Sequence, residues 1–216
     1  MRTKKVGLCL SVLSFALAVP GFCGPLENTI TKGNEWVQKK DYIKAVQEYE
    51  RAVKIDPKNA KAHLLLGLTY ANTGQLDLAI EHSMDAAILN PSYSAYHNLG
   101  LIYANKDEYE KAADAYQNAL KLNAASYQAW YEFGLLQAGH GQFAEAIHCY
   151  KKAIALNPVF PDAHLGLGSA NYWAGNKIAA IEEVNALQLL KYKDKAEALN
   201  NWIKDKEARK AGAGKS

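Results

Sequence analysis

The sequence is poor in cysteine, with three in 216 residues, and has no surplus of either charge beyond its first residues. Three cysteines cannot form an even disulfide framework, and Cys149 has no pairing partner or motif around it, so we interpret it as a small buried residue. The first 24 residues hold three of the 25 basic residues and no acidic one, which leaves 22 basic against 22 acidic residues. This neutral remainder excludes the basic domain typical of nucleic-acid-binding proteins.

Motifs of familiar catalytic chemistry are also missing. The chain has no Gly-x-Ser-x-Gly elbow, no phosphate-binding loop and no dinucleotide fingerprint. No two of its six histidines have the His-x3-His or His-Glu-x2-His spacing of a zinc site, although a site assembled from distant segments through His97 or His140 remains an alternative. We therefore predict a protein that is not an enzyme and that uses no cofactor or metal.

A basic and then apolar segment opens the chain. Arg2, Lys4 and Lys5 precede an uncharged apolar run over residues 6–19, which a Pro-Gly-Phe-Cys-Gly sequence follows. This order is typical of a secretory signal peptide, so we predict one over residues 1–24 and a periplasmic or secreted protein. Counted as far as Cys23, the run nears the length that spans a bilayer. An uncleaved membrane anchor and lipidation at Cys23 therefore stay open as alternatives.

Residues 127–160 have the spacing of two short amphipathic helices. Side chains three, four and seven positions apart share one face of a helix, and two such sets lie on either side of Gly139 and Gly141. Pro158 ends the second set, because proline lacks a backbone N–H. The first set is Trp130, Phe133, Gly134 and Gln137, and the second is Phe143, Ala146, Tyr150 and Ala153. One such pair cannot bury its own apolar face.

The same spacing recurs along the chain every 34 or 33 residues. A glycine inside a helix costs roughly 1 kcal/mol relative to alanine, so glycines in register predict that the helices of each pair approach too closely for a Cβ atom. His63 and His164 take the place of Trp130 and are predicted to be packing residues. The first-helix glycines are Gly33, Gly67, Gly100, Gly134 and Gly168, and the second-helix alanines are Ala45, Ala79, Ala112, Ala146 and Ala180.

This pattern resembles that of the tetratricopeptide repeat family, whose units have Trp, Leu-Gly and Tyr on a first helix and Ala, Phe, Ala and Pro on a second. The resemblance implies an all-α fold, a right-handed superhelical solenoid. Its five helix-turn-helix units are predicted at residues 26–59, 60–92, 93–126, 127–160 and 161–194. Asp194 and Glu197 have the spacing of a capping box, which predicts a capping helix over residues 195–209 and a flexible tail over 210–216.

The resemblance also implies where a partner binds, because the first helices of this family line a concave groove that takes extended peptides or partner helices. The side chains expected to face this groove are mainly apolar or amide-bearing, which suits an extended segment with apolar anchors. They are Asn34, Leu64, Leu68, Asn72, His97, Leu101, Asn105, Tyr131, Glu132, Leu135, Leu165, Ser169 and Trp173. For any single leucine among them, packing between repeats is the alternative role.

One subgroup of the family uses Lys, Asn and Arg on three successive first helices to hold the C-terminal carboxylates of chaperones. Too few residues match here for that function. The corresponding positions read Ile30, Asn34, Leu65, Ser94 and Asn98, or, one unit further on, Leu64, Leu68, Asn98, Gln128 and Glu132. We therefore predict an exported, non-enzymatic scaffold or adaptor that binds a protein or peptide in its groove. Two alternatives remain: a self-associating or envelope-assembly subunit of pilus, secretion or outer-membrane machinery, and an accessory domain to a separate enzyme chain.

Overall fold

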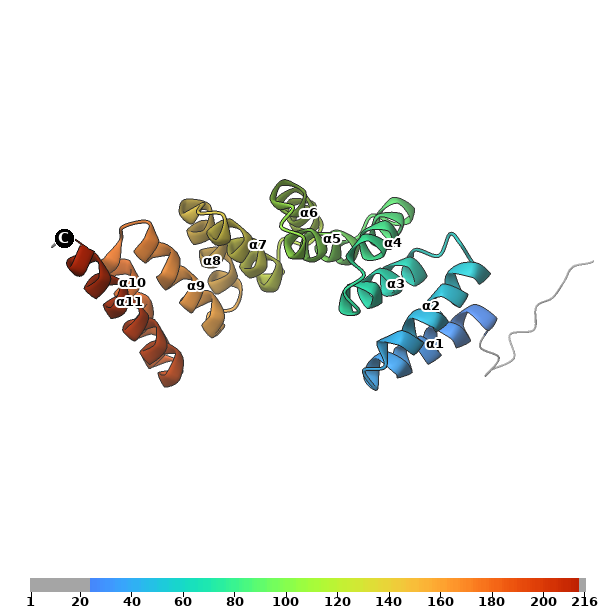
Figure 1. Cartoon of the computed structure of the whole chain (residues 1–216), viewed down its shortest axis with the longest axis horizontal. Helices are drawn as coiled ribbons and strands as arrows, with labels where there is room; N and C mark the ends of the chain where they lie inside the picture. Colours follow the sequence, from blue (N-terminus) through green and yellow to red (C-terminus); the bar gives the residue numbers. More distant parts are fainter. Residues whose placement is uncertain (1–23, 214–216) are drawn as a thin grey trace, which may run out of the picture.

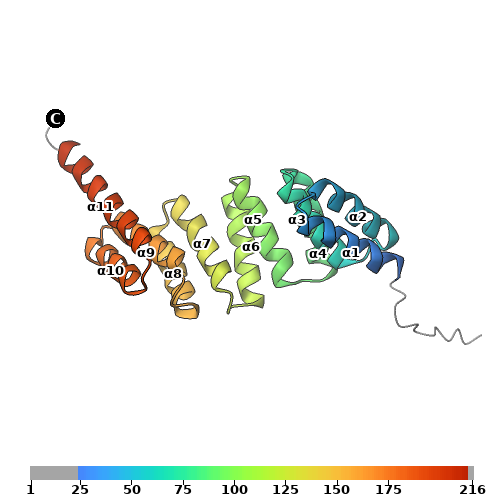
Figure 2. The same cartoon turned by 90° about the horizontal axis from the view of Figure 1, so that it is seen from below.

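The computed structural model describes residues 24–213, and this part of the chain consists of eleven α-helices without a strand. The helices follow one another along an elongated arch with α1 and α11 at opposite ends (Figures 1 and 2). Their bounds are α1 (Pro25–Gln38), α2 (Tyr42–Ile55), α3 (Ala60–Asn72), α4 (Leu76–Leu89), α5 (Tyr93–Asn105), α6 (Tyr109–Leu122), α7 (Tyr127–Gly139), α8 (Phe143–Leu156), α9 (Pro161–Trp173), α10 (Lys177–Leu189) and α11 (Lys193–Ala213). The predicted signal peptide falls outside the described residues apart from Gly24.

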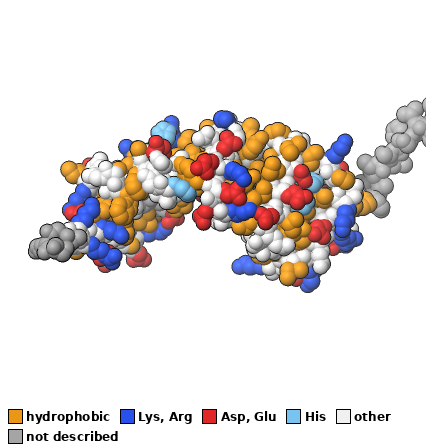
Figure 3. All heavy atoms as spheres, turned by 45° about the horizontal axis from the view of Figure 1, so that its top comes forward, with side chains coloured by type: hydrophobic (Ala, Val, Ile, Leu, Met, Phe, Trp, Pro, Cys, Tyr) orange, Lys and Arg blue, Asp and Glu red, His pale blue; other side chains and the backbone are white. Residues whose placement is uncertain are grey.

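The helices are arranged as antiparallel pairs in which each first helix packs on its second helix, and the second helix packs on the first helix of the next pair. In the middle of the arch α4 and α6 run along the outer side, and α3 and α5 lie on the inner side (Figure 1). Acidic and basic side chains are interspersed on the face seen in Figure 3. None of the helices within residues 24–213 has the length and apolar character needed to cross a membrane.

Each turn inside a pair contains one residue in the left-handed backbone conformation. Gly74, Gly141 and Gly175 adopt it with φ of +78°, +75° and +85°. Lys40 and Asp107 take the same place in the first and third pairs, with φ of 59° and 57°. This conformation costs a side chain with a Cβ roughly 1–2 kcal/mol, so these two turns store backbone strain that the glycine turns avoid.

The glycines and alanines in register lie where helices are closest, as predicted. A Cβ atom added at Gly134 would lie 2.7 Å from the ring of Tyr150, which is fully buried. At Gly67 the nearest atom is the Ser83 hydroxyl of α4 at 2.5 Å, and helix backbone lies 3.1 Å away. The equivalent contacts elsewhere are Gly33 with Tyr49 and Gly100 with Tyr116. The five second-helix alanines are all completely buried.

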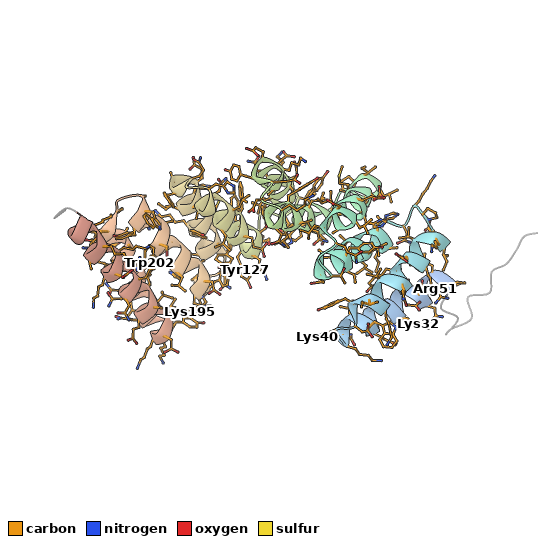
Figure 4. All side chains as sticks on the ribbon, in the orientation of Figure 1. Lys32, Lys40, Arg51, Tyr127, Lys195 and Trp202 are labelled. Atoms are coloured by element: carbon orange, nitrogen blue, oxygen red, sulfur yellow. The ribbon has the colours of Figure 1, made fainter. Side chains whose placement is uncertain are left out.

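Helix α11 covers the apolar face of the last pair. Its Leu199 packs with Val184 and Leu187 of α10, and a Cβ atom at Gly168 would lie 2.6 Å from the Leu199 side chain. Trp202, labelled on α11 in Figure 4, lies edge-on to Tyr172 of α9 with ring centroids 5.2 Å apart. These contacts remove apolar surface of α9 and α10 from water, which is what a capping helix does in a repeat array.

The bounds of α11 differ from those expected from the sequence. The helix begins at Lys193, so Asp194 lies in its first turn and does not act as the N-cap of a capping box. The reason is the preceding turn: Lys191 takes a positive φ of 66°, and the Tyr192 backbone N–H donates to the Leu187 carbonyl, which ends α10 early. At the other end the helix continues into the predicted tail as far as Ala213, because alanine and lysine favour helix.

Candidate functional site

Two adjoining cavities lie between first helices in the C-terminal half of the arch. The larger, about 490 Å³, lies between α7 and α9, and the smaller, about 360 Å³, lies between α5 and α7. Leu135 and Gly139 of α7 line both, so the two cavities form one continuous groove across three successive first helices. We refer to these two cavities together as the α5–α9 groove.

The walls of the larger cavity are mostly aromatic and aliphatic. Trp173 stacks on Phe143 with ring centroids 6.1 Å apart and planes 15° apart, and Tyr131 lies 5.9 Å from the ring of Tyr150. A Cβ atom at Gly166 would lie 2.6 Å from the Tyr150 ring, so a glycine there lets this ring reach the cavity wall. The full lining is Tyr131, Leu135, Ala138, Gly139, Phe143, Tyr150, Asp162, Leu165, Gly166, Ser169, Ala170 and Trp173.

The charged side chains of the α5–α9 groove are carboxylates. Asp162 of the larger cavity forms an ion pair with Lys195 of α11. In the smaller cavity the His97 ring donates from Nε2 to Glu132 Oε2 at 2.5 Å, because an ionised carboxylate only accepts, and Asp107 is exposed. No lysine or arginine is among the residues that line these two cavities. Such a surface favours a neutral or basic ligand over an acidic one.

The tyrosine hydroxyls of the groove remain protonated at neutral pH. Burial is the main cause that raises the pKa of Tyr131, and the carboxylates of Asp162 and Glu132 add to it. Burial likewise raises the pKa of Tyr150 and of Tyr116 above the ordinary value for tyrosine. These side chains therefore offer apolar rings with neutral hydroxyl groups, not phenolate anions.

The structure brings most of the predicted groove residues together. Those lining the α5–α9 groove are Leu101, Asn105, Tyr131, Glu132, Leu135, Leu165, Ser169 and Trp173. His97 adjoins it through Glu132. Four residues of the first two units lie apart from this groove. Leu64 packs against buried residues of α4 and α5, Asn34 accepts from the Tyr49 hydroxyl, Asn72 donates to the Leu68 carbonyl, and Leu68 itself is half-buried.

Sequence reasoning missed several residues of the groove, of which Phe143 and Gly166 matter most. Phe143 has the spacing of a packing residue on its second helix, so the sequence did not indicate that its ring would stack against Trp173. Gly166 has no glycine at the equivalent place in the preceding unit, where Glu132 stands. A glycine out of register with the repeat is the one signal that could have marked this wall of the cavity.

The other candidates for chemistry named from the sequence are histidines and Cys149. His63 and His164 are buried, as expected of packing residues, and burial raises the pKa of the Cys149 thiol to about 12. Cys149 is therefore a buried thiol with little nucleophilic character at neutral pH. Within residues 24–213, neither His97 nor His140 belongs to a group of three side chains that could hold a metal ion.

The fold and the groove define an all-α helical-repeat protein whose first helices contribute most of the lining of an open groove. Family models described as TPR repeat match residues 33–74 and 139–175, and models described as tetratricopeptide repeat match residues 60–93 and 93–124. The chain is 31% identical to the MamA protein of a crystal structure, with a TM-score of 0.72, over 79% of this chain and 94% of that one. It belongs to the tetratricopeptide repeat family.

Curated relatives match over shorter stretches. Anaphase-promoting complex subunit 3 of Schizosaccharomyces pombe is 32% identical over 96 residues, which are 44% of this chain and 14% of that protein. Hsp70-Hsp90 organizing protein 3 of Arabidopsis thaliana is 31% identical over 91 residues, which are 42% of this chain and 16% of that protein. The chain thus spans only about one seventh of the length of these two relatives.

Proposed function

We propose that this protein is a scaffold or adaptor that binds an extended protein segment along α5, α7 and α9, and that it acts by binding and not by catalysis. The observation that carries the proposal is the larger cavity of about 490 Å³, walled by Tyr131, Leu135, Leu165 and Trp173. A cavity of this size lined by aromatic and aliphatic side chains accommodates an apolar anchor. The names of the two curated relatives, a complex subunit and an organizing protein, support an interaction role.

The lining defines the chemistry of the bound segment. Leu135 is 46% exposed and Trp173 is 47% exposed, so both offer apolar surface that an aromatic or large aliphatic side chain would cover. The carboxylates of Asp107 and Glu132 border the neighbouring cavity. The segment therefore has an apolar anchor flanked by neutral or basic residues, whereas an acidic tail would meet charge repulsion.

Selection of displayed random peptides on the full-length protein tests this function. Leu135→Asp places a charge on the shared wall of both cavities, and Leu156→Asp on α8, where Leu156 is 43% exposed and lines neither cavity, is the matched control. We expect selected peptides to carry an aromatic or large aliphatic residue and to bind the Leu156 variant as the wild type. The Leu135 variant should bind at least tenfold more weakly. Equal loss in both variants, or selected peptides without an apolar anchor, would contradict the proposal.

Self-association is a second candidate, which one observation favours. Helix α10 exposes Ile178 at 75% and Leu189 at 83%, and such apolar side chains on an outer helix suit contact with another copy. Light scattering over a range of concentrations decides between the two. A mass that rises with concentration in the wild type but not in Ile178→Asp supports assembly through α10, and a constant monomer mass refutes it.

We also propose that the protein is exported to the periplasm or beyond the cell. The support comes from the sequence, in which Arg2, Lys4 and Lys5 precede the apolar run over residues 6–19. The intact mass of the protein recovered from periplasm or medium tests this. A mass lacking about the first 24 residues supports a cleaved signal peptide. A full-length protein released from membranes only by detergent supports an anchor, and recovery from the cytoplasm alone refutes export.

A further inference from the structure

Three side chains with metal-binding atoms meet in the second helix pair, apart from the α5–α9 groove. His63 comes from α3, and His82 and Asp85 come from α4. The two histidine Nδ1 atoms are 3.1 Å apart. Asp85 Oδ2 lies 3.3 Å from the Nδ1 of His63 and 3.9 Å from the Nδ1 of His82. The sequence gave no warning of this group, because the two histidines lie on different helices.

The hydrogen bond of His63 Nε2 indicates which ring nitrogen carries a proton. His63 Nε2 lies 3.1 Å from the carbonyl oxygen of Pro57, which can only accept a hydrogen bond. The fourth pair provides an internal check, because there Trp130 occupies the place of His63, and its indole N–H, a donor only, lies 3.0 Å from the Ala124 carbonyl oxygen. Nε2 of His63 therefore carries a proton, and in the neutral ring Nδ1 presents a lone pair to His82 and Asp85.

In the fifth helix pair, the residue equivalent to His63 faces one carboxylate in place of a histidine and an aspartate. There His164 takes the place of His63, its Nε2 lies 3.0 Å from the Pro158 carbonyl oxygen, and its Nδ1 lies 2.6 Å from Glu183 Oε2. A single proton between His164 Nδ1 and the Glu183 carboxylate satisfies both atoms with one hydrogen bond. In the second pair His82 stands where Glu183 does, and Asp85 joins it, so three atoms that can each offer a lone pair converge where the fifth pair has two.

The spacing of these three atoms also fits a divalent cation. Ligand nitrogens about 2.0–2.1 Å from a tetrahedral zinc ion lie roughly 3.4 Å from one another, close to the 3.1, 3.3 and 3.9 Å separations found here. The bond from His63 to the Pro57 carbonyl is the outer contact that orients most metal-ligating histidines. Tyr70 stacks on the His82 ring at 5.7 Å, which fixes that ligand as well.

The surroundings are suited to a cation and leave it accessible. The Tyr70 hydroxyl donates to Glu50 Oε1 at 2.6 Å, which adds a second carboxylate beside the Tyr70 and His82 rings. His63 is buried, whereas the Asp85 side chain is 43% exposed, so solvent reaches the group from the Asp85 side. We propose that His63, His82 and Asp85 bind a divalent first-row transition-metal ion such as Zn²⁺. Water completes the coordination of this ion, and the ion links α3 to α4.

Titration of the full-length protein with Zn²⁺ alone by calorimetry, and with Co²⁺ by visible absorption, tests this site. The variants are His82→Gln and Asp85→Asn, and His164→Gln in the equivalent place of the fifth pair is the matched control. We expect the control to bind Zn²⁺ as the wild type does. The His82 and Asp85 variants should bind at least tenfold more weakly, since loss of even an outer contact costs 10–100-fold, and they should lose the Co²⁺ absorption bands.

Circular dichroism identifies any variant that fails to fold, and the partly exposed Asp85→Asn keeps the test valid if His82→Gln is misfolded. Two outcomes overturn the proposal. One is a wild type that shows no saturable binding up to roughly millimolar Zn²⁺, far weaker than protein metal sites. The other is binding that is equal in the wild type and in both folded ligand variants.

Discussion

Two glycines of α7 provide a test of why glycines recur in register along this chain. Gly134 is in register, and an added Cβ would lie 2.7 Å from Cε1 and 2.9 Å from Cδ1 of Tyr150. Gly139, the last residue of the same helix, has no atom within 4 Å of the added Cβ. Gly134→Ala and Gly139→Ala therefore make the same chemical change on one helix, with and without a steric neighbour.

The expected magnitudes differ in sign. Alanine is favoured over glycine in a helix by about 1 kcal/mol, and less at its last residue, so Gly139→Ala should stabilise the protein by about 0.5 kcal/mol. At position 134 the Tyr150 ring would have to retreat by about 1 Å to reach an ordinary carbon–carbon distance. The ring is fully buried and also lies against Gly166, so the larger cavity that it lines is the space into which it can retreat. Overpacking of this kind costs about 1–3 kcal/mol, and the helix-propensity gain of about 1 kcal/mol reduces this to a net loss of up to about 2 kcal/mol.

Urea unfolding followed by far-ultraviolet circular dichroism measures the difference. The expected gap of about 0.5–2.5 kcal/mol between the two variants corresponds to urea midpoints up to about 1 M apart for a slope of about 2 kcal/mol per M. The wild type should lie between them, nearer to Gly139→Ala. If Gly134→Ala proved as resistant to urea as Gly139→Ala, the registered glycines would not report close packing, and the steric explanation of the repeat would be wrong.

Three further predictions concern the turns, the cap and the thiol. Lys40→Gly should raise the melting temperature by about 2–4 °C and Gly74→Ala should lower it by as much, because both positions have positive φ; two unchanged temperatures would contradict this. The ion pair with Lys177, together with the Tyr172 hydroxyl, holds the pKa of Glu207 below 4.5. Since the folded-state pKa is the lower one, this pair stabilises α11 fully above pH 4.5 and is lost as the pH falls through the folded value. Hydrogen exchange of α11 should accelerate in that acid range in the wild type but show no such step in Glu207→Gln. Iodoacetamide at neutral pH should leave Cys149 unmodified in the folded protein and label it in urea, as peptide mass spectrometry would show; rapid labelling without urea would refute its burial.

The repeat itself could be predicted from the sequence because it depends on local spacing. Helical periodicity, breaks at Gly139 and Gly141 and the proline at position 158 set the bounds of the helices, and α7 and α8 lie where they were expected. The registered alanines and glycines predicted the packing of each pair, since only small residues fit where helices are closest. The resemblance to the family placed several first-helix side chains on the inner face, and eight of them line the α5–α9 groove.

The tertiary structure alone decided how side chains from different helices meet. The α7–α9 separation leaves a cavity at the stacked rings of Trp173 and Phe143, and the packing of α3 on α4 brings His63 to His82 and Asp85. The start of α11 depended on the turn at Lys191, which the spacing of residues in the sequence did not predict. Repeat periodicity fixes which face of a helix a residue occupies. The distance between two faces depends on every side chain packed between them, and only the folded chain establishes it.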